Sequence, residues 1–379
     1  MINQTEQAIY RLGNLDALQQ KISYQMSTGK KLQQGSDDSL LYSREVFVDD
    51  KIRIFEGLKT QIERTNTQNN VADSSMSEIK KILEFVKAEL IKANTATTSI
   101  NGMSAIASNL EGMRQNLLDL ANTQVGGEYI FTGSDSSVKP FTENSNGIVS
   151  YEGNNVLRKV AVEEGSYRQR GLTGLDMMMY PSSTAHKGEA LTFKDSDRVI
   201  DQDGNEWKLN SPTNDTLTKY DLSGNITADT ITPVTFDLAN NNYTANVPTT
   251  DGTKFEAKTN ILNEMSSVIK SLRQVDESGN SITMEEARAG IAKGLGNLEK
   301  AFDATNLAHA ELGGRNKVFE VSLEKVSARL THYNILSQEL GAADLSKVAM
   351  EAKALELTYT ALYSTINRTN QLSLVNFLN

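Results

Sequence analysis

Cysteine is absent from this chain of 379 residues, and its five prolines all lie between Pro140 and Pro248. Without cysteine there is no disulfide framework, no thiolate zinc site and no cysteine nucleophile. Hydrophobic residues make up 38% of the chain and aromatic residues only 6%. Since single domains usually stop near ~150 residues, this length and composition favour an elongated or modular protein.

Positively charged residues are outnumbered: the chain has 38 Lys and Arg and 48 Asp and Glu, which gives a net charge of -10. Surfaces that bind nucleic acid need clustered Lys and Arg to release counterions, so we expect no nucleic-acid partner. No apolar run approaches the ~20 residues that span a bilayer, so we expect no membrane association. Residues 1–15 lack the basic start and apolar run of a cleaved signal, so we expect any export to need a dedicated apparatus.

Apolar residues follow a heptad pattern in the first third of the chain. Steps of four and three residues alternate regularly, which gives the a/d stripe of a coiled coil. The first run comprises Ala72, Met76, Ile79, Leu83, Val86, Leu90 and Ala93, and the second comprises Met103, Ile106, Leu110, Met113, Leu117 and Leu120. The runs are out of register, and between them Thr95–Gly102 holds β-branched residues and glycine, which weaken a helix. We predict a helix from about Asp38 to about Asn94, a break, and a second helix.

The last third repeats this pattern, with a register change at Gly341. One stripe holds Phe319, Leu323, Val326, Leu330, Tyr333 and Leu340, and the next holds Leu345, Val348, Ala352, Leu355, Tyr359, Leu362 and Ile366. A narrow apolar stripe must pack against another helix or another subunit. The expected partners of the last stripe, which Leu372, Leu374, Phe377 and Leu378 extend, are Ala8, Leu12, Leu15, Ile22 and Met26.

The middle of the chain, from Glu128 to Lys258, has a different composition, rich in Gly, Asn, Thr and Asp. Short runs at 148–153, 158–165, 189–193 and 206–210 are typical of strands between turns, and Asp203-Gly204 is a hairpin turn signal. We therefore predict a mainly α protein with an inserted β-rich domain between two helical arms.

No set of residues typical of catalysis or cofactor binding stands out. None of the three histidines has metal-ligand spacing, and the carboxylates of 195–207 lack the ligand ladder of a calcium loop. The glycines of 294–297 lack the Lys-Ser/Thr of a phosphate loop. We expect no enzymatic activity, no metal and no cofactor.

Five stretches in order resemble bacterial flagellins and the flagellin-like hook–filament junction proteins. The first stretch, "QMSTGKKLQQGSDDSLLYSREV", is similar to the flagellin N-terminal signature. The second, "LANTQVGGEYIFTGSDSSVKPF", is similar to a signature of the junction proteins. The five stretches lie at 25–46, 120–141, 149–165, 308–320 and 342–379. The family usually has Asp-Asp-Pro where this chain has Asp37, Asp38 and Ser39. Loss of the proline removes a preset φ at the first helical turn, but the capping acids remain.

The resemblance implies long terminal helices packed as an antiparallel coiled-coil bundle, which form and pair on assembly. The expected domains begin with an N-terminal helix at 1–35 and end with a C-terminal helix at 341–379. Between them we expect a helical rod in two parts, 36–127 and 259–340, and a central β-rich surface domain at 128–258. The expected assembly interface comprises Leu12, Leu15, Ile22, Met26, Leu345, Val348, Leu355, Tyr359, Leu362, Ile366, Leu374 and Phe377.

For function, the resemblance implies a structural adaptor at the hook–filament junction that templates the flagellin filament. It would be secreted by the flagellar type III apparatus without a cleaved signal and would form a ring between a hook-side junction protein and the flagellin or filament-cap side. An export chaperone would bind its C-terminal helix beforehand. One alternative is a flagellin filament subunit, and a more remote one is a flagellin-like scaffold with an enzymatic or ligand-binding central domain.

Overall fold

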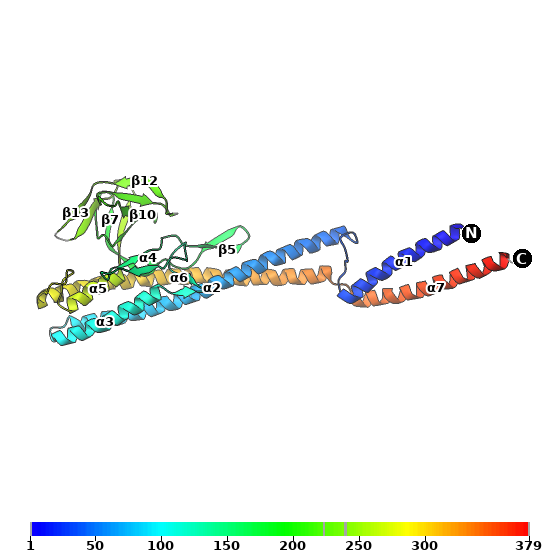
Figure 1. Cartoon of the computed structure of the whole chain (residues 1–379), viewed down its shortest axis with the longest axis horizontal. Helices are drawn as coiled ribbons and strands as arrows, with labels where there is room; N and C mark the ends of the chain where they lie inside the picture. Colours follow the sequence, from blue (N-terminus) through cyan, green and yellow to red (C-terminus); the bar gives the residue numbers. More distant parts are fainter. Residues whose placement is uncertain (1, 223, 239–240, 378–379) are drawn as a thin grey trace. The chain divides into compact units, whose positions relative to one another are not determined.

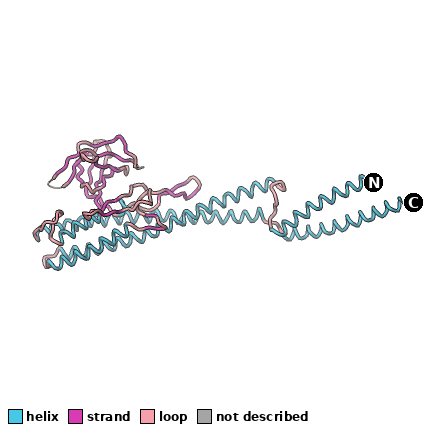
Figure 2. Tube along the Cα trace, viewed as in Figure 1, coloured by secondary structure: helices cyan, strands magenta, loops and turns pink. Residues whose placement is uncertain are grey.

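The computed structural model describes residues 2–222, 224–238 and 241–377, with side chains described except at 2–5, 8 and 369–377. The chain divides into two compact units, one made of Met1–Thr60 with Glu324–Asn379 and the other of Gln61–Leu323. Helices account for the beginning and the end of the chain, and strands for its middle (Figure 2). The predicted fold class, mainly α with an inserted β-rich domain, is confirmed.

Helix α2, Ser39–Ala93, and helix α3, Ile100–Ala121, form where the heptad runs predict them. The backbone N–H of Leu41 donates to Asp38 Oδ1 over 3.0 Å, so an acid caps α2 although the proline is missing. Ser99 caps α3 by accepting a hydrogen bond from a backbone N–H of its first turn. The predicted break between the two helices is therefore confirmed.

Helices α2, α3, α5 (Ile261–Leu272) and α6 (Met284–Gly341) form most of the main core of the second unit. Helices α5 and α6 return alongside α2 and α3 (Figure 1). Their buried apolar side chains include the predicted heptad positions, namely Met76, Ile79, Leu83, Val86, Leu90, Met103, Ile106, Leu110 and Leu117, with Leu262, Met265, Ile291 and Leu312. Since burial of each large apolar side chain contributes about 1.5 to 3 kcal/mol, this core dominates the stability of the unit.

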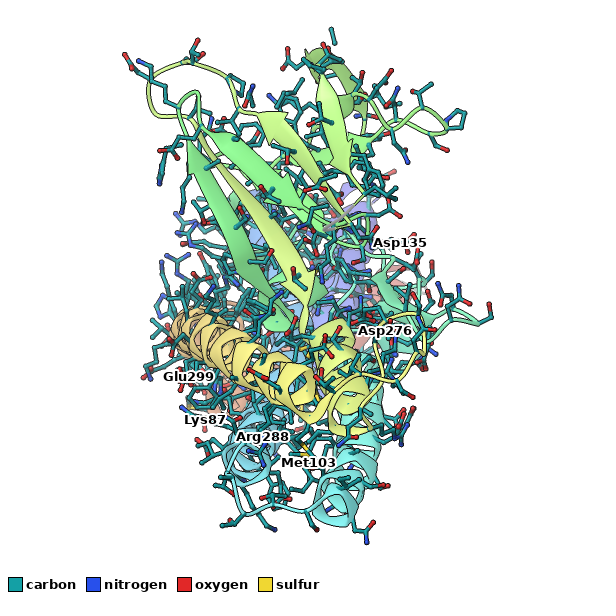
Figure 3. All side chains as sticks on the ribbon, turned by 90° about the vertical axis from the view of Figure 1, so that its left-hand side faces the viewer. Lys87, Met103, Asp135, Asp276, Arg288 and Glu299 are labelled. Atoms are coloured by element: carbon teal, nitrogen blue, oxygen red, sulfur yellow. The ribbon has the colours of Figure 1, made fainter. Side chains whose placement is uncertain are left out.

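Polar contacts at one end of the core tie the helices together. Lys87 Nζ of α2 and Glu299 Oε1 of α6 are 2.8 Å apart, and Figure 3 shows both residues on the same side of the bundle. Arg288 Nη2 of α6 donates to the carbonyl oxygen of Ala96, in the turn between α2 and α3, over 3.2 Å. The turn is thus attached to the neighbouring helix.

Three small antiparallel hairpins follow α3. Their strands are β1 (Gln124–Val125) with β2 (Glu128–Tyr129), β3 (Phe141–Glu143) with β4 (Val149–Tyr151), and β5 (Lys159–Glu163) with β6 (Ser166–Gln169). Strands β4 and β5 confirm two of the predicted runs. The short helix α4, Gly174–Met177, packs closely against β4, because a Cβ on Gly174 would lie 2.5 Å from the ring of Tyr151.

The inserted domain consists of two antiparallel sheets. Their strands are β7 (Met179–His186), β8 (Ala190–Phe193), β9 (Arg198–Asp201), β10 (Glu206–Leu209), β11 (Leu217–Tyr220), β12 (Ile226–Ile231), β13 (Val234–Asp237), β14 (Asn242–Asn246) and β15 (Lys254–Asn260). The orders are β12-β11-β10-β9-β15-β7 and β13-β14-β8. Strands β8 and β10 confirm the other two predicted runs. The predicted turn between β9 and β10 also forms, with Gly204 at a φ of +83°.

The first unit contains helices α1, Ile2–Thr28, and α7, Leu345–Phe377, with the adjoining parts of α2 and α6. Helix α6 ends at Gly341, as the register change predicts. Within this unit, the ring of Phe55 on α2 stacks on Tyr333 of α6 with their centroids 5.5 Å apart. The heptad stripe of α6 therefore faces α2 here.

Candidate assembly interface

Helices α1 and α7 lie side by side and antiparallel, with both chain ends at the same end of the pair (Figure 1). We call them the terminal helix pair. Ile22 of α1 is buried against Val348 and Leu355 of α7, and each of these three side chains is at most 6% exposed. The side chains packed partly around them are Leu15, Ala343, Ala352 and Tyr359. The heptad positions thus carry the packing inside the pair.

The other expected interface residues take three different environments. Leu12, Leu362 and Ile366 are half-buried. Met26 and Leu345 are 53% and 54% exposed, because they lie where α1 ends and α7 begins. The side chains expected at Leu374 and Phe377, and at Ala8, Leu372 and Leu378, lie outside what the structure describes. That the expected interface residues contact another copy of the chain stays a prediction.

A polar contact that the heptad pattern does not reveal also joins the pair. The Tyr359 hydroxyl donates to Asp16 Oδ1 over 2.7 Å. Partial burial, and after it this hydrogen bond to a carboxylate, raise the pKa of Tyr359 to about 12. The contact fixes the register of α1 against α7, because a side-chain hydrogen bond is more directional than apolar packing.

The loops at the inner end of the terminal helix pair are joined by backbone hydrogen bonds. Lys30 and Ala342 form an isolated antiparallel bridge. The N–H of Lys31 donates to the Gly341 oxygen over 2.7 Å, and the N–H of Ala343 donates to the Gly29 oxygen over 2.8 Å. The α1–α2 and α6–α7 connections are therefore held next to each other.

The terminal helix pair also carries large apolar side chains that nothing in the described part of the chain covers. On α1 and α7 they are Ile9, Tyr10, Leu18, Met350, Leu357 and Tyr363, which are 45% to 72% exposed. Exposed apolar residues gathered on one element mark interaction surfaces. The pair thus has one apolar side packed inside the chain and further apolar residues available outside it.

The residues that the structure describes contain no group of three or more His, Asp or Glu placed to hold a metal ion. Within those same residues, no helix combines the length and the hydropathy needed to cross a bilayer.

Comparison with known proteins gives these helices a context. Residues 3–136 match the family of the bacterial flagellin N-terminal helical region. The N-terminal part of the chain is flagellin-like. This confirms the resemblance that the sequence motifs indicate, and the match covers α1 from residue 3 onward and the whole of α2 and α3.

Two curated relatives of this chain are named flagellar hook-associated protein 3. The protein from Salmonella typhimurium is 28% identical over 145 residues, which are 38% of this chain and 45% of the relative. The protein from Escherichia coli K12 is 29% identical over 141 residues, 36% of this chain and 44% of the relative. The chain therefore matches somewhat less than half the length of these curated relatives.

Solved structures share the fold over a larger part of the chain. Flagellar hook-associated protein-3 from Legionella pneumophila aligns with 78% of this chain and 98% of its own at a TM-score of 0.52 and 17% identity. A putative flagellar hook-associated protein from Vibrio parahaemolyticus aligns with 81% of this chain and all of its own at a TM-score of 0.53 and 12% identity. At such identities the likeness shows the fold alone.

Proposed function

We propose that this chain is a structural adaptor of the bacterial flagellum, acting at the hook–filament junction rather than as an enzyme. The observation that carries the proposal is the terminal helix pair, in which α1 belongs to the flagellin-like region and both helices have exposed apolar side chains. The names of the two curated relatives support the assignment to the hook end of the filament.

The exposed apolar surface of these helices is suited to assembly. Long helices with a narrow apolar stripe bury little on their own and take most of their stability from tertiary neighbours. Between α1 and α7, Ile22, Val348 and Leu355 are buried, whereas Met350 and Leu357 of α7 are 68% and 65% exposed. Covering each such side chain is worth about 1.5 to 3 kcal/mol, so contact between copies would stabilise a ring.

The proposal includes the partners and the route of the chain. Copies form a ring between a hook-side junction protein and flagellin or the filament cap, and the ring templates the filament. Before assembly, an export chaperone covers the apolar side of α7. The chain leaves the cell through the flagellar type III apparatus without a cleaved signal, and its absence of cysteine avoids cross-links during passage.

A flagellin filament subunit is the second candidate, because the match over residues 3–136 is to flagellin itself. The names of the two relatives favour the junction. The two roles differ in copy number, since a junction is a thin ring and a filament is a long polymer.

Deletion of the gene separates these roles. Cells are examined by electron microscopy for appendages, and the culture medium by gel for secreted flagellin. For a junction adaptor we expect hooks without filaments and intact flagellin in the medium. Bare hooks without flagellin in the medium would instead identify the chain as the filament subunit, and normal filaments would contradict both roles.

A further inference from the structure

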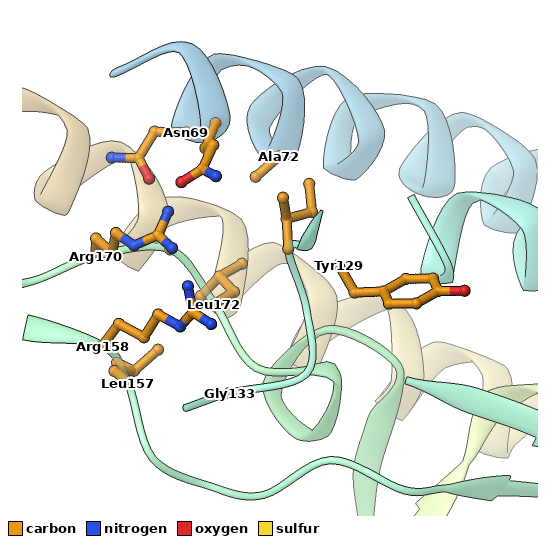
Figure 4. Close-up of a pocket in the computed structure, with 11 residues that line it drawn as sticks. Asn69, Ala72, Tyr129, Gly133, Leu157, Arg158, Arg170 and Leu172 are labelled. Carbon is orange, nitrogen blue, oxygen red and sulfur yellow. The ribbon is translucent and has the colours of Figure 1, made fainter. Parts of the chain in front are cut away.

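A small polar pocket lies between α2 and the hairpins that follow α3. Its lining includes Asn69 of α2, Tyr129 of β2, and Arg158 and Arg170 from around the third hairpin. Figure 4 shows the two arginine side chains extending in the same direction, with Asn69 on the α2 side. The pocket is thus built by segments that are far apart in the sequence.

Positive charge exceeds negative charge at this pocket. The carboxylate of Glu128 lies beside it and accepts from Arg64 Nη2 over 2.9 Å and from Gln68 Nε2 over 3.0 Å. Arg158 Nη1 lies 3.6 Å from the same carboxylate. Arg170 adds a third guanidinium, and burial followed by repulsion from Arg158 lowers its pKa to about 10. The exposed carboxylate of Asp135 also interacts with the charge of Arg158. The guanidinium groups of Arg64, Arg158 and Arg170 therefore outnumber the carboxylates of Glu128 and Asp135, and all three remain charged at neutral pH.

The pocket also contains an unused hydrogen-bond donor. Asn69 is only 2% exposed, and its Nδ2 has no acceptor among the residues that the structure describes. A buried donor left without an acceptor destabilises the folded protein, because the group has lost its hydrogen bonds to water. Such a donor beside surplus positive charge calls for an anionic acceptor.

The size of the pocket limits what can enter. The space open to the centre of a water-sized sphere is about 20 Å³, a little more than the roughly 10 to 15 Å³ that one water requires. A whole cofactor or nucleotide is excluded, but the tip of one side chain fits. A guanidinium pair recognises a carboxylate through charge-assisted hydrogen bonds, whereas water would leave the charge unbalanced.

We propose that this pocket receives the carboxylate of an Asp or Glu side chain from a second copy of the chain. Arg158 and Arg170 bind the carboxylate, and Asn69 donates a hydrogen bond to it. A second copy is a suitable donor, because the chain carries 48 Asp and Glu and the ring brings copies together. The inference rests on the proposed ring, and it assigns a contact outside the terminal helix pair.

The first test uses variants expressed in the deletion strain. Arg170→Gln and Asn69→Leu should both lower the temperature at which filaments detach from the cell. Arg168→Gln is the matched control, because Arg168 lies on β6, is exposed and is not among the residues lining the pocket, so this variant should behave as the wild type does.

The unfolding temperature of the purified monomer shows whether a variant has lost its fold or only its contact with other copies. Asn69→Leu removes an unpaired donor, so it should unfold at the same or a higher temperature than the wild type while its filaments detach more easily. Detachment of the Arg170→Gln and Asn69→Leu filaments at the wild-type temperature would overturn the proposal. If the deletion strain had normal filaments, the proposed function itself would fail first.

The second test identifies the occupant. Leu157 lines the pocket, and in a chain without cysteine Leu157→Cys places a single attachment point for a photoactivated cross-linker. In assembled flagella, we expect a cross-linked dimer that contains peptides of this chain alone. A product with another protein would overturn the choice of occupant. Stabilisation of the monomer by sodium acetate over sodium chloride, without any cross-link, would show binding of a free anion only and overturn it as well.

Discussion

At the scale of single residues, the inserted domain holds a carboxyl group in an unusual setting. Asp197 precedes β9, and burial raises its pKa above the ordinary value of 3.8. The hydroxyl of Thr259 and the N–H of Lys194 oppose this shift, donating to Asp197 over 2.8 and 2.9 Å. The net shift is upward, so removal from water outweighs the two hydrogen bonds.

The shift gives folding stability a definite pH dependence. Because the native carboxyl keeps its proton at pH values where the unfolded one has lost it, the native state binds more protons and stability falls as the pH rises above 3.8. Asp197→Asn should remove this contribution and flatten the decline. Urea unfolding at a series of pH values measures it, with Asp195→Asn, at an exposed neighbour, as the control. An unchanged slope in Asp197→Asn would contradict the assignment.

At the scale of elements, the terminal helix pair depends on few side chains. Leu355 of α7 is buried against α1, and Leu362 is half-buried further along the same heptad stripe. An uncompensated charge in a buried position costs about 3 to 5 kcal/mol. A helix pair with so small a core cannot absorb such a cost and should separate instead.

The double variant Leu355→Asp with Leu362→Asp should therefore prevent assembly while leaving the second unit folded. Filament formation in complemented cells and circular dichroism of the purified monomer measure the two effects. Thr360→Asp with Ser364→Asp adds the same charge at exposed positions of α7 and should assemble. Normal filaments in the leucine variant would show that this stripe is not required for assembly.

Elements also show where sequence reasoning succeeds. Heptad spacing identifies Ile22, Val348 and Leu355 because a stripe of period 3.5 must be covered along a helix. It cannot anticipate the bridge between Lys30 and Ala342, because backbone amides are the same in every residue. It also misses the arginines around Glu128, whose side chains converge from separate segments only after the hairpins have folded.

At the scale of the whole molecule, the inserted domain is attached through two paired strands. Strands β7 and β15 are antiparallel neighbours from Met179 opposite Asn260 to His186 opposite Lys254. Its apolar core, which includes Phe255 and Trp207, is a cluster of its own. Ile200 belongs instead to the helical core, so the two are not fully separate.

Removal of most of the inserted domain should consequently leave the helices intact. Replacing residues 182–257 by a short Asn-Gly turn would join Pro181 and Lys258, which are already partners in the ladder. Helical circular dichroism and filament formation should be retained, with a modest loss of thermal stability where Ile200 leaves a gap. Loss of the helical signal would show that the rod depends on the insert.

The pairing of β7 with β15 also has a mechanical meaning. Because the chain enters and leaves the inserted domain through adjacent strands, that domain branches off the helical bundle and does not lie in series with it. Tension or torque along the helices would pass through α2, α3, α5 and α6 without being carried by the sheets. A change in the size or surface of the sheets would then leave the stiffness of the helical bundle unaltered.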